Sequence, residues 1–82
     1  MTSNEQSVYD TMKKVIGDRG EILKVICYGD VMDDTFEFTV IFDTEHAALS
    51  AFYKYRFTFA DNASCVNIGE SPNHGGWYIT IR

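Results

Sequence analysis

Residues 35–42, TFEFTVIF, constrain the fold more than any other part of the chain. Their side chains alternate between an almost wholly aromatic set and a largely polar set, as in a strand with one covered face. The first set is Phe36, Phe38, Val40 and Phe42, and the second is Thr35, Glu37, Thr39 and Ile41. A slip of one residue would expose the whole aromatic set, so the pattern strongly determines which face is buried.

Two rounds of helix, strand and strand surround this octapeptide. The first helix is expected to begin near Ser3 and to end at Gly17, with an apolar stripe of Val8, Met12, Val15 and Ile16. Strands are expected over residues 21–28 and 35–42. A second helix follows over residues 45–57, with Asp43 and Thr44 as candidate N-caps. The last two strands are expected over residues 65–70 and 77–82.

This order predicts a single α+β domain over residues 1–82, with a four-stranded sheet and two helices on one face. If the first strand of a βαββαβ ferredoxin-like sheet is moved to the C-terminus, the order becomes αββαββ, a circularly permuted ferredoxin-like arrangement. Residues 35–42 and 77–82 would then be the central strands, and SPNHGG, residues 71–76, would turn the last hairpin. The alternative is two αββ units that pair in another strand order.

The strand periodicity divides the apolar residues between the two faces of this sheet. The face toward the helices is expected to carry Leu23, Val25, Phe36, Phe38, Val40, Phe42, Trp77, Ile79 and Ile81. The other face is expected to carry Ile26, Tyr28, Ile41 and Tyr78, bordered by Lys24, Glu37, Thr39, Thr80 and Arg82. An aromatic and aliphatic group with a polar border is typical of an interface, with either a second copy or another protein.

The chain is acidic, with a formal net charge of -5. This charge disfavours direct nucleic-acid binding and suits a partner protein with a basic surface. The carboxylates expected to meet such a partner are Asp30, Asp33, Asp34, Asp43 and Glu45. No apolar run is long enough to span a membrane, and the polar N-terminus does not resemble a signal peptide. We therefore expect a cytoplasmic protein that does not contact a membrane.

Residue types that carry chemistry are few and scattered. The two histidines, His46 and His74, and the two cysteines, Cys27 and Cys65, have no recognised metal-ligand spacing, so we expect neither a metal nor another cofactor. His74 lies in the expected 71–76 turn, and Asn73, Gly75 and Gly76 suit a turn better than a catalytic loop. The cysteines are expected to be reduced packing residues.

These observations predict a small acidic binding protein, not an enzyme, that acts through protein–protein contacts as a regulator, adaptor or inhibitor. A phage or mobile-element inhibitor of a nucleic-acid enzyme, with carboxylates in place of phosphates, would fit this composition. Two alternatives remain open: an RNA-binding module that uses the open sheet face, and a small enzyme that uses His74 or Cys65.

Overall fold

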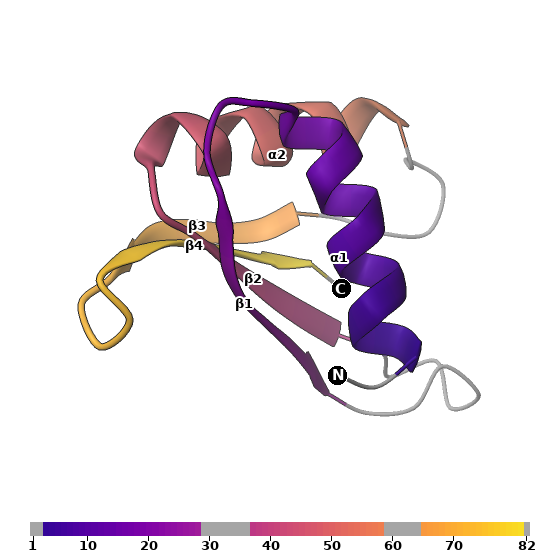
Figure 1. Ribbon diagram of the computed structural model, residues 1–82, viewed down its shortest axis with the longest axis horizontal. Helices are drawn as coiled ribbons and strands as arrows, with labels where there is room; N and C mark the ends of the chain where they lie inside the picture. The colour runs from indigo at the N-terminus through magenta and orange to yellow at the C-terminus, as the bar shows by residue number, and fades with distance from the viewer. Residues whose placement is uncertain (1–2, 29–36, 59–64, 82) are drawn as a thin grey trace.

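The computed structural model describes residues 3–28, 37–58 and 65–81 (Figure 1). The elements follow the predicted order, α1 (Ser3–Ile16), β1 (Ile22–Tyr28), β2 (Glu37–Phe42), α2 (Glu45–Thr58), β3 (Cys65–Ser71) and β4 (Gly76–Ile81). Phe36 and the acidic residues Asp30, Asp33 and Asp34 lie outside the described residues. The α+β class and the αββαββ order predicted from the sequence are confirmed.

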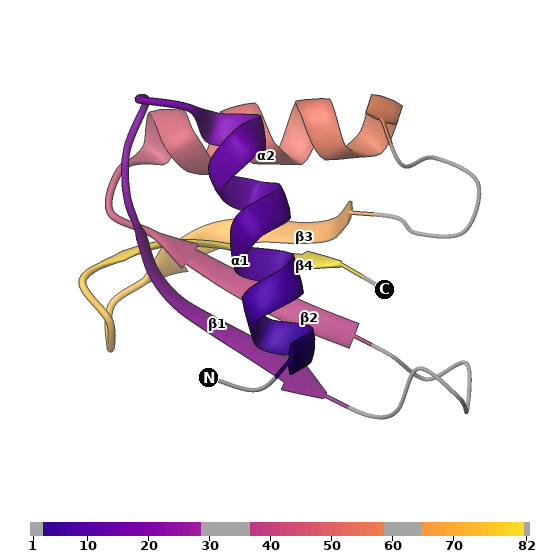
Figure 2. The same cartoon turned by 45° about the vertical axis from the view of Figure 1, so that its right-hand side comes forward.

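The four strands form one antiparallel sheet in the order β1-β2-β4-β3. The predicted central strands, β2 and β4, are central, and the last two strands are joined as the predicted hairpin. This strand order is compatible with a circularly permuted ferredoxin-like arrangement. Both helices lie on the same side of the sheet, so neither α1 nor α2 covers its other side (Figures 1 and 2).

The hydrophobic core lies between the helices and the sheet. The predicted stripe of α1 is buried through Val8, Met12 and Ile16, and β2 and β4 contribute Phe38, Val40, Phe42, Ile79 and Ile81. Helix α2 instead buries three alanines, Ala47, Ala48 and Ala51. Because alanine is small, α2 can lie close to the backbone of β3 and β4, against which it packs.

One predicted core residue is misplaced. The sequence pattern assigns Leu23 to the core, but the Leu23 side chain is 48% exposed. The register of β1 shifts between Ile22, which pairs with Phe42, and Lys24, which pairs with Ile41. This bulge makes Ile22 the inward residue and leaves Leu23 beside Lys24 on the side away from the helices. Strict alternation cannot anticipate an extra residue in a strand.

The hairpin between β3 and β4 is a tight turn, as predicted. The backbone N–H of His74 donates to the carbonyl of Ser71 at 3.1 Å, which closes the turn around Pro72. Gly75 then takes φ of 68°, a conformation that glycine adopts without steric cost. His74 is exposed, and its Nδ1 lies 3.0 Å from Ser71 Oγ. The side-chain contact therefore reinforces the turn that the backbone already makes.

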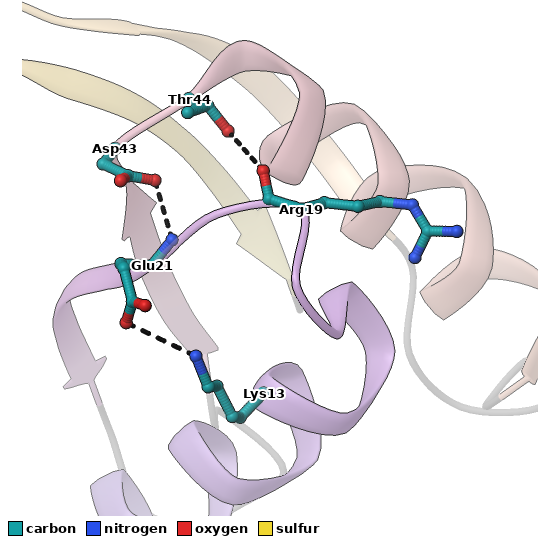
Figure 3. Close-up of polar contacts among 5 residues, drawn as sticks. All are labelled: Lys13, Arg19, Glu21, Asp43 and Thr44. Carbon is teal, nitrogen blue, oxygen red and sulfur yellow. Dashed lines mark hydrogen bonds and ion pairs between the residues drawn. The ribbon is translucent and has the colours of Figure 1, made fainter.

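Polar contacts join the loop between α1 and β1 to the start of α2 (Figure 3). Asp43 Oδ1 accepts from the backbone N–H of Glu21 at 2.7 Å, and the Thr44 hydroxyl donates to the carbonyl of Arg19 at 3.1 Å. The same Thr44 oxygen accepts from the N–H of Ala47 at 3.1 Å, which makes Thr44 the N-cap of α2. Lys13 and Glu21 add an exposed ion pair at 3.3 Å.

Candidate functional site

The candidate site is the side of the sheet away from the helices, which we call the open face. Strand register arranges it in rows across the sheet. One row runs Lys24, Ile41, Tyr78 and Gly69, the next runs Ile26, Thr39, Thr80 and Asn67, and a third begins with Tyr28 and Glu37. The four apolar site residues predicted from the sequence, Ile26, Tyr28, Ile41 and Tyr78, therefore share this face, and the predicted neighbours Ile41 and Tyr78 are paired in register.

The middle of the open face is tightly packed. Ile41 is only 2% exposed although no helix covers it, because it lies between Lys24 and Tyr78 with the bulged Leu23 nearby. The Tyr78 ring lies over Gly69 of β3, where a methyl group on Gly69 would come 3.0 Å from Tyr78 Cε1. An aromatic ring over a glycine on the neighbouring strand stabilises that strand pair. Ile41 is therefore part of the packed interior of the sheet and offers almost no surface to a partner.

The accessible apolar surface of the open face lies toward β1. Tyr28 is 50% exposed and Leu23 is 48% exposed, while Ile26 is half-buried between them along the strand. Among the described residues, the other large apolar side chain with comparable exposure is Tyr53, at 56%, on α2 and so on the helix side. Sequence reasoning missed Leu23 here, and only the bulge reveals it.

The polar residues of the open face are largely uncharged. The hydroxyls of Thr39 and Thr80 lie 3.2 Å apart across the two central strands. Among the described residues of the open face, Lys24 and Glu37 carry the formal charges, and these cancel. The excess negative charge of the chain is therefore carried elsewhere.

Of the acidic residues predicted to meet a basic partner, the two that the structure describes do not join this face. Asp43 and Glu45 lie at the junction of β2 and α2, and both are exposed. One carboxylate oxygen of Asp43 already accepts from the Glu21 backbone, so Asp43 has a structural role at this junction. Asp30, Asp33 and Asp34 lie outside the described residues, and their predicted role stays a prediction.

The described side chains that could catalyse a reaction or bind a metal ion are also dispersed. Within residues 3–28, 37–58 and 65–81, no group of three His, Cys, Asp or Glu side chains is placed to hold a metal ion. His46 is exposed in the first turn of α2, and His74 is exposed in the β3–β4 turn. Among the contacts of the described residues, the Ser71–His74 pair resembles a nucleophile beside a base, but both residues lie in a hairpin turn at the surface.

Cys27 lies on the helix side of β1, where it packs against the core. Its burial raises the pKa of the thiol, and the nearby Glu5 carboxylate raises it further. Because the thiolate is the reactive form, we expect folded Cys27 to be alkylated by iodoacetamide at pH 8 more slowly than the same residue in urea. Peptide mapping by mass spectrometry measures the Cys27 rate separately from that of Cys65. Equal rates in the folded and denatured chain would contradict this environment for Cys27.

Comparison of the chain with protein-family models, with curated proteins and with solved structures finds no match. In the part of the chain that the structure describes, no helix is long and apolar enough to cross a membrane.

Proposed function

We propose that this chain is a non-enzymatic, cytoplasmic protein that acts by binding a protein through its open face. The observation that carries the proposal is the bulge in β1. It places Leu23 on the open face, where Leu23, Ile26 and Tyr28 make an accessible, largely apolar strip on one edge strand, with Lys24 between Leu23 and Ile26. Apolar and aromatic side chains in such a strip are the usual anchors of protein interfaces.

The surroundings of this strip support the same proposal. Ile41 and Tyr78 are held by their neighbours in the sheet, so the surface beneath a partner is rigid. A rigid surface loses little conformational entropy on binding. The hydroxyls of Thr39 and Thr80 form a polar border beside the strip. On binding, these hydroxyls can replace hydrogen bonds to water with hydrogen bonds to the partner. A regulator, adaptor or inhibitor would use such a face without any chemistry of its own.

Affinity capture with two matched variants tests the proposal. Tyr28→Glu places a carboxylate in the apolar strip, and Tyr53→Glu makes the same change on the helix side at a residue of similar exposure. We expect the wild type and Tyr53→Glu to capture the same stoichiometric protein from the native cell, and Tyr28→Glu to lose it. Burying an unpaired carboxylate in an interface should weaken binding at least about tenfold.

Circular dichroism of both variants controls for folding. If Tyr28→Glu folds and captures every protein that Tyr53→Glu captures, the open face is not the functional surface. The RNA-binding alternative gives a different result: the wild type would bind single-stranded RNA with an affinity that falls steeply as salt increases, and nuclease treatment would remove the captured material.

A further inference from the structure

We infer that the occupant of the open face is a second copy of this chain, packed sheet against sheet. The inference rests on the proposed function, because it names the partner of the same face. Three features of the described residues favour a second copy over a basic protein or a nucleic acid: the charge of the face, the geometry of the two sheet edges and the size of the sheet.

The charge of the open face allows self-association of an acidic chain. Two copies with a net charge of -5 repel each other at long range. Lys24 and Glu37 cancel on the described open face, so the two copies can meet there without placing like charges together. A basic protein or a phosphate backbone would gain little from the described part of this face, on which the two charges cancel.

The arrangement of the rows is also self-complementary. Lys24 lies in one outer row and Glu37 in the other, with the row of Ile26, Thr39 and Thr80 between them. A two-fold axis along this middle row exchanges the outer rows. It would bring Lys24 of one copy toward Tyr28 and Glu37 of the second copy, and Ile26 toward Ile26. Opposite charges and a cation–π contact then face each other in both halves of the interface.

The sheet edges are less suited to association than the face. Both edge strands carry an irregularity in register, between Ile22 and Lys24 in β1 and between Cys65 and Asn67 in β3. Bulges and an edge lysine hinder strand addition at a sheet edge. Edge pairing would moreover leave the exposed Tyr28 and Leu23 uncovered, whereas face packing covers them.

The sheet is large enough for a weak dimer. Four strands of about six residues, spaced about 4.8 Å apart with about 3.3 Å per residue, cover about 400 Å² of sheet plane. Two copies together therefore bury about 800 Å² of plane, and somewhat more once side-chain relief is counted. This area is smaller than that of standard stable interfaces, so a dimer formed through it would be weak, reversible and concentration-dependent.

Sedimentation velocity of the untagged full chain from about 1 µM to about 1 mM tests this inference, since weak protein association falls in that range. We expect the wild type and Tyr53→Glu to shift from the mass of one chain to that of two as concentration rises. Ile26→Glu, which brings the carboxylates of the two copies together at the axis, should weaken the dimer at least about tenfold. A wild type that stays monomeric throughout the range overturns the inference, as does a folded Ile26→Glu that dimerises like the wild type.

Cross-linking locates the two-fold axis, and it tests the dimer even if Ile26→Glu does not fold. In a background with Cys27→Ala and Cys65→Ser, Ile26→Cys should give covalent dimers with a short bis-maleimide, and Tyr53→Cys should not. Monomers from both overturn the proposed packing. The proposed function can survive this failure: a monomeric wild type that captures a different protein, lost with Tyr28→Glu, keeps the open face as an interface with a foreign partner.

Discussion

Gly76→Ala is expected to destabilise the protein by about 3 kcal/mol, the upper end of the cost of overpacking a filled site. A methyl group on Gly76 would overlap the carbonyl oxygen of Phe42 on the neighbouring strand β2, and would also come 3.0 Å from Leu23 Cδ1. The carbonyl belongs to the backbone of a central strand and cannot rotate away. Strands β2 and β4 would have to separate where the hairpin begins. A domain of this size has about 4–12 kcal/mol of total stability, so the loss is a large part of it.

Urea denaturation followed by circular dichroism measures this loss, and the adjacent glycine supplies its control. Gly75 has φ of 68°, and a methyl group there would meet no atom within 4 Å. Gly75→Ala should therefore cost only the conformational strain of a left-handed residue, about 1–2 kcal/mol. If both variants lose the same stability, the close approach of Gly76 to Phe42 is not the cause.

Gly20→Ala is expected to cost about 2–4 kcal/mol through the polar contacts at the start of α2. A methyl group on Gly20 would come 2.6 Å from Asp43 Oδ1, 2.7 Å from Thr44 Oγ1 and 2.9 Å from Ala47 Cβ. The two oxygens would be displaced from the backbone groups of Arg19, Glu21 and Ala47 that they bind. Three hydrogen bonds at about 0.5–1.5 kcal/mol each sum to about 1.5–4.5 kcal/mol, and the expected loss lies within these limits.

Two further variants separate these contributions in thermal or urea melts. Thr44→Val removes both hydrogen bonds of the N-cap hydroxyl, to Ala47 and to Arg19, and should cost about 1–3 kcal/mol. Gly17→Ala tests a glycine of the same connection with φ of 60° and no close neighbour except Arg19 Nη1 at 3.9 Å, so strain of about 1–2 kcal/mol is expected. A Gly20→Ala variant as stable as Thr44→Val would show that the connection moves aside without breaking its other contacts.

The arrangement of the fold could be predicted from local patterns because those patterns report burial directly. The stripe of Val8, Met12 and Ile16 fixed the inner side of α1, and the alternation around Phe38 and Val40 fixed the inner side of β2. Connection rules favoured the observed strand order once the elements were known, but they left another pairing of two αββ units open. The start of α2 was narrowed to two candidate caps, and Thr44 is the one that caps it.

The candidate site was only partly predictable, since it depends on deviations from those patterns. Alternation placed Ile26 and Tyr28 correctly. The bulge that turns Leu23 outward arises from the pairing of β1 with β2, so the sequence of β1 alone does not reveal it. The burial of Ile41 depends on its neighbours across the sheet. The tie between Asp43 and Glu21 joins residues 22 positions apart, and no local signal connects them.

The alanine face of α2 has a consequence for the substitutions that each helix can tolerate. On α1 the buried side chains are large, so most substitutions there shrink a side chain and leave a cavity. On α2, Ala47, Ala48 and Ala51 are already nearly as small as a side chain can be, and almost every substitution enlarges them. Selection would therefore confine this stretch of α2 to alanine, glycine and serine, while letting the volume of the α1 stripe drift and be compensated. The two helices that share one core would diverge in sequence at different rates, with α2 the more restricted.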